Sequence, residues 1–297
     1  MNLEALKCLC AVVEEESFRK AAERLHRSQP AISQQVKALE TEIGHLLLER
    51  KTCRLTPIGL LLYDRARHIL NETESLTKEL EDFDETQVGE LRVGTSDTTA
   101  LYVLPEVVLR FAKAMPQTHL AMVNRASRAI AEQVARGELD LGIVTLPVDN
   151  DELIEHDLFE QQLILVVPSG HELATRNRVN LSELSEEPFL LLNPYTRTGS
   201  ILQALFTREA FSPQIVLDSG SFEVIKRYVA EGIGVAFLPR IVITPDDCGL
   251  AIVNVPGLPR LRIGVIQRRH AYRTHAERAF LELLHAHRGD IKGQHSS

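Results

Sequence analysis

The amino-acid sequence predicts a multidomain protein, in which an α-helical N-terminal domain precedes an α/β domain made of two lobes. Up to about residue 86 the apolar residues recur at helical spacing, whereas from residue 90 short apolar strands such as "LRVGT" (91–95) alternate with helices. The length of 297 residues also exceeds one ordinary domain, and the 44% hydrophobic share is typical of globular domains with buried cores.

Charge is distributed unevenly along the chain, whose net charge is −8. Residues 17–67 carry ten Lys and Arg against five Asp and Glu, a net +5, whereas residues 68–87 carry one lysine against seven acids. A basic segment in an acidic chain indicates a module that binds a polyanion. A chance fluctuation of surface charge is the alternative.

The chain has the features of a cytoplasmic protein. It contains no run of 18 apolar residues, and its first residues are acidic where a signal peptide is basic. Its four cysteines, at 8, 10, 53 and 248, are expected to be reduced thiols. We therefore expect no membrane partner.

The first sixty residues predict three helices. Leu3, Leu6, Cys10 and Val13 have the spacing of a first helix, and Ser17 is a suitable N-cap for a second. Ser28 then caps a third helix with Pro30 in its first turn, where the missing N–H costs nothing. Ile32, Val36, Leu39 and Ile43 form the buried stripe of this third helix, and Ser33, Gln34 and Lys37 face outward.

Two helices joined by a tight turn, with small alanines between them, predict a helix-turn-helix whose second helix enters a DNA major groove. Gln and Ser supply donors and acceptors for base edges, and Lys and Arg neutralise phosphates. The segment "LLLERKTCRLTPIG" (46–59) predicts a two-stranded wing with Arg50, Lys51 and Arg54 near its tip. An ordinary three-helix unit with a solvated polar face remains the alternative.

A long helix follows over residues 57–86. Its apolar residues are spaced alternately by four and three, as in the seam of a dimeric coiled coil: Leu62, Ala66, Ile69, Thr73, Leu76, Leu80 and Phe83. A dimer would hold two helix-turn-helix units at the spacing that a two-fold DNA site needs. A helix lying on its own domain would show a similar pattern.

The α/β part begins after a predicted hinge at 87–89, and its sheet is expected to be largely parallel. Ligands of such sheets bind at the carboxyl ends of strands, and here those ends are rich in hydroxyls, as in "GTSDTT" (94–99) and "YTRTGS" (195–200). Hydroxyls and free N–H groups at helix starts favour an anion, to which Arg197, Arg125 or Arg128 could add charge. Simple helix capping would use the same residues.

The sequence resembles the LysR-type transcriptional regulators. The resemblance lies in "FRKAAERLHRSQPAISQQVKALETEIGHLLLERKTCRLTPIG", "RVGTSDTTALYVLPEVVLRFAKAMP", "GELDLGIVTLP", "LILVVPSGHELA" and "VAEGIGVAFLP", and it covers essentially the whole chain. It departs from the family pattern at Leu48, where phenylalanine is usual.

This resemblance implies a winged helix-turn-helix and linker helix joined to a two-lobed effector domain of the periplasmic-binding-protein type (type 2). The implied domains are 1–60 for DNA binding, 57–86 for dimerisation, 90–164 with 267–292 for lobe I, and 165–266 for lobe II. The residues that match DNA-facing positions are Ser28, Gln29, Pro30, Ser33, Gln34, Lys37, Arg50 and Arg54, with Gln34 at base edges and the cations at phosphates. Those that match effector positions are Ser96, Thr98, Thr99, Ser127, Thr145, Thr196 and Thr198.

The implied partners are double-stranded promoter DNA, a small anionic or zwitterionic metabolite, and further copies of the chain in a dimer or tetramer. RNA polymerase is a further candidate. Asp97 does not fit an anion site, because its carboxylate would repel an anionic ligand. The alternatives are that this carboxylate points outward or that it binds the amine of a zwitterionic effector.

An enzyme and a plain solute-binding protein are the rival hypotheses. An enzyme needs a nucleophile or an acid/base group in the cleft, and the hydroxyl-rich segments offer only Asp97. Neither rival needs the basic N-terminal segment. We therefore expect no catalytic residue, no metal and no cofactor beyond the effector. Five histidines (270, 275, 285, 287 and 295) fit no zinc spacing and predict a solvated, partly disordered tail.

Overall fold

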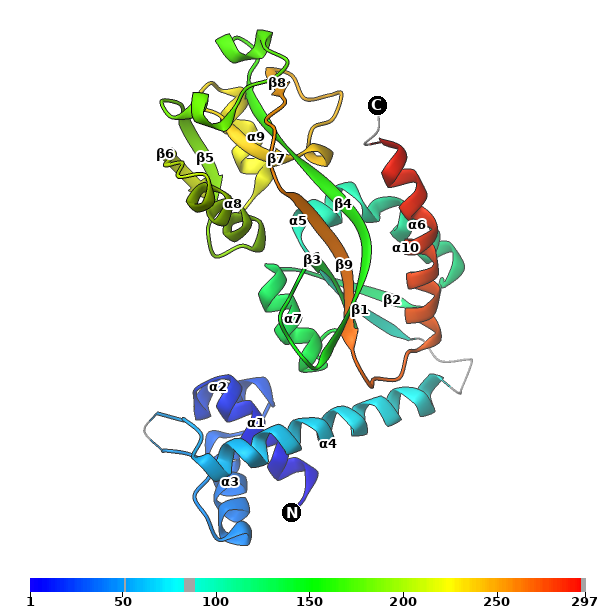
Figure 1. Ribbon diagram of the computed structural model, residues 1–297. Coiled ribbons are helices and arrows are strands. Elements are labelled where there is room, and N and C mark those ends of the chain that lie inside the picture. Colours follow the sequence, from blue (N-terminus) through cyan, green and yellow to red (C-terminus); the bar gives the residue numbers. More distant parts are fainter. Residues whose placement is uncertain (51, 83–88, 295–297) are drawn as a thin grey trace. The chain divides into compact units, whose positions relative to one another are not determined.

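The structure is a computed structural model that describes residues 1–50, 52–82 and 89–294. The chain divides into two compact units, Met1–Asp84 and Glu85–Ser297. Each unit is described by itself below (Figure 1). Phe83 of the predicted seam and residues 87–88 of the predicted hinge lie outside the described residues.

The first unit contains the predicted helices α1 (Leu3–Glu14), α2 (Phe18–Arg24), α3 (Gln29–Ile43) and α4 (Pro57–Asp82). The side chain of Ser17 accepts a hydrogen bond from the Lys20 N–H, and that of Ser28 accepts one from the Ala31 N–H, so both predicted caps are confirmed. Pro30 lies in the first turn of α3. The core of this unit combines the inner face of α3 with α1, the alanines of α2 and Ala66 of α4.

The wing joins α3 to α4. Its two arms meet in an antiparallel bridge between Leu48 and Leu55, and the Thr56 N–H donates to the Leu47 carbonyl at 3.0 Å. Gly59 sits where α4 crosses this arm: a Cβ at this residue would lie 2.0 Å from the Leu47 carbonyl oxygen. Glycine is therefore required for the wing to contact the first turn of α4.

The second unit is an α/β domain. Its strands are β1 (Glu90–Thr95), β2 (His119–Asn124), β3 (Leu141–Thr145), β4 (Leu153–Pro168), β5 (Pro188–Leu192), β6 (Gln214–Ser219), β7 (Ala236–Pro239), β8 (Leu250–Val253) and β9 (Arg260–Arg268). Its helices are α5 (Asp97–Tyr102), α6 (Leu104–Ala114), α7 (Ser127–Ala135), α8 (Arg197–Arg208), α9 (Phe222–Ala230) and α10 (His275–Gln294), with three short 3₁₀ turns.

The sheet is mixed, so the prediction of a largely parallel sheet is wrong. The order is β2-β1-β3-β9-β4-β7, with β8 also paired to β4, and β5 and β6 form a second, parallel pair. Within the larger sheet, β1 pairs in parallel with β2 and β3, whereas β4 and β9 run antiparallel to each other and to their other neighbours. The reason is that the chain leaves lobe I along β4 and returns along β9.

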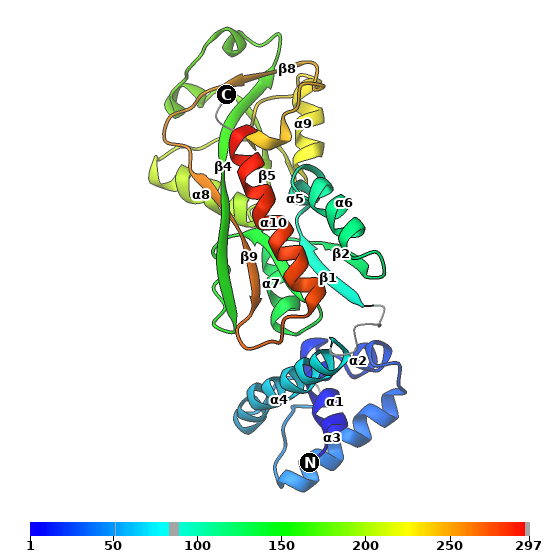
Figure 2. The same cartoon turned by 90° about the vertical axis from the view of Figure 1, so that its right-hand side faces the viewer.

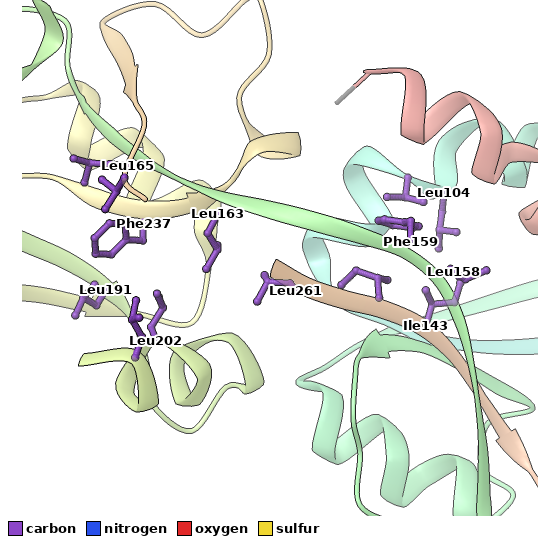
Figure 3. Close-up of a cluster of buried hydrophobic side chains, with 14 of the residues drawn as sticks. Leu104, Ile143, Leu158, Phe159, Leu163, Leu165, Leu191, Leu202, Phe237 and Leu261 are labelled. Carbon is purple, nitrogen blue, oxygen red and sulfur yellow. The ribbon is translucent and has the colours of Figure 1, made fainter. Parts of the chain in front are cut away.

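These two crossing strands carry a continuous hydrophobic core. Leu158 and Phe159 of β4 lie near Leu104 and Ile143, and further along the same strand Leu163 and Leu165 lie near Phe237, Leu191 and Leu202 (Figure 3). Leu261 of β9 lies between the two groups. The predicted lobe boundaries, at 164/165 and 266/267, therefore fall inside β4 and β9.

The predicted disordered tail is instead a helix over most of its length. Helix α10 packs against α6, with Phe280 and Leu284 buried and the Phe280 ring 5.4 Å from that of Phe111 (Figure 2). His287 is buried, while His270, His275 and His285 are exposed. The apolar spacing of 276, 280 and 284 drives this helix onto lobe I.

Candidate functional site

The exposed face of α3 carries the polar side chains that were predicted to meet DNA. Ile32, Val36 and Leu39 hold the opposite face of the helix in the core. Ser28, Gln29, Pro30, Gln34 and Lys37 are exposed, and Ser33 is half-buried. The amide of Gln34 and the ammonium of Lys37 are therefore available on the same helix for a base edge and a phosphate.

The two arginines of the wing differ in their surroundings. Arg54 is exposed, and its carbonyl accepts a hydrogen bond from the Glu49 N–H. Arg50 forms an ion pair with Glu40, and its guanidinium lies 5.5 Å from the centre of the Phe18 ring. Arg50 thus connects the wing to α2 and α3, a structural role that the sequence analysis did not predict.

Glu40 is the residue that holds this wing in place. Its side chain is 5% exposed, and its Oε1 accepts the N–H groups of Leu47 at 3.0 Å and Leu48 at 3.4 Å while its Oε2 meets Arg50. Sequence reasoning missed Glu40, although it lies four residues after Val36 and so on the buried side of α3. A carboxylate at such a position indicates a buried hydrogen-bond network.

A hollow of 640 Å³ lies between α3 and the wing. It is lined by Ser33, Lys37, Glu40, Thr41, Gly44, His45, Leu46 and Arg50. Three of the predicted DNA-binding residues therefore meet at one concave surface of the first unit, and two of them are cations. Gln34 and Arg54 do not line this hollow.

Helix α4 corrects the start of the predicted dimer seam. Ala66 is fully buried in the core of its own unit, and Leu62 packs against the same core. The later seam residues Ile69, Leu76 and Leu80 are 41%, 55% and 66% exposed. Among the predicted seam residues, the outward apolar ones therefore begin at Ile69.

A buried carboxylate connects α4 to the helix-turn-helix. Glu14 of α1 accepts hydrogen bonds from Arg24 of α2 at 2.7 Å and from Arg67 of α4 at 2.8 Å, and the Tyr63 hydroxyl donates to it at 3.2 Å. Burial alone would raise the pKa of Glu14, but the two arginines outweigh it and lower this pKa below its usual value. Three helices are therefore held by one ionised side chain.

In the second unit, the seven residues predicted to bind an effector all line one pocket. The pocket has a volume of 270 Å³ and lies where α5, α7 and α8 begin and β3 ends. Ser96, Thr98, Thr99, Ser127, Thr145, Thr196 and Thr198 are among its lining residues. Segments about 100 residues apart in the chain thus converge on one pocket, as expected for a ligand site at the carboxyl ends of strands.

The hydroxyls of the pocket already take part in local structure. Ser96 caps α5 through the Thr99 N–H at 3.3 Å, and Ser127 accepts the Thr145 N–H at 3.2 Å. Thr196 caps α8 through the Gly199 N–H at 3.0 Å and donates its proton to the Asn193 carbonyl. The hydroxyl of Thr196 therefore has no proton left for a ligand.

Two acidic side chains also line the pocket. Asp97 accepts a hydrogen bond from the Asn124 amide at 2.9 Å. Glu223, which sequence reasoning missed, meets the Tyr102 hydroxyl and forms an ion pair with Lys226 at 3.1 Å. Burial alone would lower the pKa of Lys226, but its contacts with Tyr102, Asp247 and Glu223 raise it well above its usual value. Lys226 therefore stays charged, and its ammonium is shared between the carboxylates of Glu223 and Asp247.

Two residues that line the pocket each carry a buried donor atom without a hydrogen-bond partner among the described residues. The two atoms are the Nε2 of Gln161, on β4, and the Nε of Arg197, at the start of α8. Arg197 was a candidate from the sequence, whereas Gln161 was missed because its local sequence, "FEQQL", carries no signal of a site. Gly199 allows the first turn of α8 to pack against the Asn193 backbone, since a Cβ there would lie 2.2 Å from the Asn193 carbonyl oxygen.

Neither a metal-ligand cluster nor a membrane-spanning helix is found in the part of the chain that is described. No group of three or more His, Cys, Asp or Glu side chains there could hold a metal ion. No helix formed by those residues is both long enough and apolar enough to cross a membrane.

Comparisons with known proteins agree with this two-part arrangement. A family profile described as "Bacterial regulatory helix-turn-helix protein, lysR family" matches residues 3–60, and one described as "LysR substrate binding domain" matches residues 84–289. The DNA-binding transcriptional dual regulator OxyR of Escherichia coli (strain K12) is 31% identical over 277 residues, which cover 90% of each chain.

Two solved structures share the fold. A full-length OxyR variant from Pseudomonas aeruginosa has a TM-score of 0.67 and 24% identity, over 97% of this chain and 94% of its own. The regulatory domain of Synechocystis CcmR, in complex with 2-PG, has a TM-score of 0.63 and 23% identity, over 67% of this chain and 96% of its own.

The family profiles cover both units in the expected order, and the relatives are transcriptional regulators, not enzymes. The chain therefore belongs to the LysR family of bacterial transcriptional regulators, which join a DNA-binding helix-turn-helix domain to an effector-binding domain.

Proposed function

We propose that this regulator reads promoter DNA through α3 and the wing, and that a small molecule in the pocket of the second unit controls this binding or the activation of transcription. The observation that carries the proposal is the convergence of seven hydroxyl-bearing residues, from separate parts of the chain, on one pocket. Because its DNA target is the bacterial chromosome, the protein works in the cytoplasm.

On DNA, Gln34 contacts base edges, and Lys37 and Arg54 contact phosphates. Ser28, Gln29, Pro30 and Ser33 complete the DNA-facing surface. Arg50 contributes charge at the hollow beside Lys37, but its first task is to hold the wing through Glu40.

Two or four copies of the chain act together, with the outward apolar residues of α4 as the contact. Ile69, Leu76 and Leu80 form this surface, to which the exposed side chains of Ile58, Leu60 and Leu61 add at the start of the helix. A two-fold dimer presents two α3 helices to a palindromic site. Contact with RNA polymerase at the promoter is a further part of the proposal.

The effector is anionic or zwitterionic. The second unit resembles the CcmR regulatory domain, which was solved with the ligand 2-PG. A cavity of 270 Å³ suits a small metabolite better than a large cofactor.

The test is DNA binding by the full-length chain. We expect it to bind DNA from its own upstream intergenic region about 1,000-fold more tightly than scrambled DNA at physiological salt. Gln34→Ala should relax the sequence preference, whereas Arg54→Ala should weaken binding to all sequences and reduce the salt dependence by about one phosphate contact. Equal, weak binding to both DNAs, or the same behaviour of both variants, would contradict the proposal.

A further inference from the structure

Tyr102 belongs to one lobe of the second unit and packs on the other. It is the last residue of α5, a helix that directly follows β1 of lobe I. Its side chain nevertheless packs against a buried cluster of lobe II that contains Ile225, Val229 and Val242. Helix α5 also contacts the 3₁₀ turn Arg240–Val242, and it lies beside α9 (Figure 2). Tyr102 therefore joins the lobes at a place outside the crossing strands β4 and β9.

The hydroxyl of Tyr102 is held by two charged side chains of α9. It donates a hydrogen bond to the Oε1 of Glu223 and accepts one from the Nζ of Lys226 at 3.0 Å. This Nζ also lies 5.5 Å from the centre of the Tyr102 ring, which is within the range of a cation–π interaction. Burial and the hydrogen bond to Glu223 raise the pKa of Tyr102 above its usual value, so the hydroxyl keeps its proton and remains a donor at neutral pH.

Lys226 is anchored within lobe II. Its side chain is 10% exposed, and its Nζ donates to the Val242 carbonyl at 2.9 Å and pairs with Asp247 at 3.1 Å. Asp247 in turn accepts the N–H of Thr244 at 2.8 Å. The ammonium therefore cannot follow Tyr102 if lobe I moves away. Separation of the lobes would break both hydrogen bonds of the hydroxyl, and hydrogen bonds to charged groups are among the stronger ones in proteins.

We propose that Tyr102 is a latch between the two lobes, and that its contacts with Glu223 and Lys226 hold the lobes closed around the pocket when no effector is bound. The inference goes beyond the proposed function, because it assigns the resting position of the lobes to the protein itself. It does not depend on which molecule occupies the pocket.

The latch adjoins the pocket at both of its ends. Ser96 and Thr99, in the cap and first turn of α5, line the pocket, and Tyr102 ends the same short helix. Glu223, the acceptor of the Tyr102 proton, lines the pocket from the side of α9. A movement of α5 away from α9 would separate these parts of the wall. The latch therefore sets the width of the pocket.

The crossing strands leave room for a movement of this kind. Strands β4 and β9 pair with a register irregularity between Asp157 and Phe159, and such an irregularity bends a strand locally. Two lobes that are joined by two strands can change their angle through a few residues at a hinge. Side-chain contacts away from the strands, such as those of Tyr102, then decide which angle is populated.

The experiment measures the distance between the lobes in the full-length protein by double electron–electron resonance. Spin labels are attached at Glu132→Cys on α7 of lobe I and Arg208→Cys on α8 of lobe II, two exposed positions on helices that both begin at the pocket. Cys248→Ser removes the exposed native thiol, and the other three native thiols are buried. An excess of unlabelled chain confines the measured distances to one chain.

We expect the wild type without ligand to give one narrow distance distribution. Tyr102→Phe keeps the ring in the cluster of lobe II but loses both hydrogen bonds, so the share of chains at longer distances should rise about ten-fold. Glu223→Leu removes one of these bonds and should have a smaller effect in the same direction. Because the two changes break the same hydrogen bond, the double variant should show less than the sum of their effects.

Two matched controls separate the latch from general effects. Tyr195→Phe removes the hydroxyl of a tyrosine that is 91% exposed. Glu231→Leu removes an exposed carboxylate at the end of α9, where it pairs with Arg227 and not with lobe I. Both controls should keep the wild-type distribution, and calorimetry on the same samples shows that each variant is folded.

Three outcomes would overturn the inference: the wild type already shows the longer distances, Tyr102→Phe leaves the distribution unchanged, or Tyr195→Phe widens it equally. A lower melting temperature of Tyr102→Phe with an unchanged distance would show that Tyr102 only packs. If Tyr102→Phe does not fold, Glu223→Leu carries the test, and an unchanged distribution in that variant refutes the latch.

Discussion

Replacing Glu40 with alanine should detach the wing from α3. The carboxylate is buried and accepts hydrogen bonds from the N–H groups of two buried residues, Leu47 and Leu48, in addition to its ion pair with Arg50. Alanine removes all three interactions and leaves two buried backbone donors without an acceptor. The same change leaves the guanidinium of Arg50, which lies over the Phe18 ring in the wild type, without its carboxylate partner.

The magnitude follows from these contacts. Each hydrogen bond to a charged acceptor contributes about 1.5–3 kcal/mol, and the longer one, to Leu48, belongs at the low end of that range. The ion pair adds little, because the side chain of Arg50 is 40% exposed and solvent screens it. The expected loss in the free energy of unfolding is therefore about 3–5 kcal/mol. For a unit of this size that is a decrease in melting temperature on the order of 20 °C.

Calorimetry of the full-length protein would follow the transition of the first unit. Glu40→Gln keeps one oxygen for the backbone N–H groups and should lose only about 1 kcal/mol. Glu42→Ala, an exposed change on the same helix, should remain within about 0.5 kcal/mol of the wild type. If Glu40→Ala melts like Glu42→Ala, the wing is not held by Glu40.

Further predictions concern pH, thiols and assembly. The pKa of Glu14 is lower in the folded protein than in the unfolded chain, so its ionised carboxylate stabilises the fold at pH values above the unfolded pKa of about 4.3. This stabilisation is lost as the pH falls through the folded pKa. In urea unfolding, Glu14→Gln should therefore flatten the decrease in stability that the wild type shows below about pH 4.5. Burial raises the pKa of the Cys10 thiol to about 12, while Cys248 is exposed. Mass spectrometry after brief treatment with iodoacetamide should therefore find Cys248 modified and Cys10 intact. The reverse pattern would refute the packing of α1. Leu76→Asp combined with Leu80→Asp should lower the mass measured by sedimentation, and an unchanged mass would place the contact outside α4.

The helices of the first unit could be predicted because their signals are local. A cap such as Ser28 and its N–H partner lie three residues apart, and the stripe through Ile32 and Val36 repeats every three or four residues. Such spacing is visible in any short window of the sequence. The hydroxyl-rich strand ends are also visible in short windows of the sequence, and their residues line the pocket. Their role in binding an effector is part of the proposed function.

The sequence was less informative about the crossing strands. The first ten residues of β4, "LIEHDLFEQQ", contain three acidic residues and a histidine, and they resemble a loop until their partner is known. That partner is β9, about 100 residues later in the chain. Their antiparallel direction follows from the return of the chain to lobe I. Neither the pairing nor its direction leaves a trace in the spacing of neighbouring residues.

By itself the sequence therefore determined the order of the domains, the caps and buried stripes of their helices, and the polar residues at the strand ends. Only the tertiary structure decided that Ala66 faces its own core, that Glu40 accepts the wing's N–H groups, and that Gln161 is buried at the pocket. The physical reason is distance along the chain: helical spacing and capping act within one turn, whereas burial of a polar group depends on residues that folding brings together from remote segments.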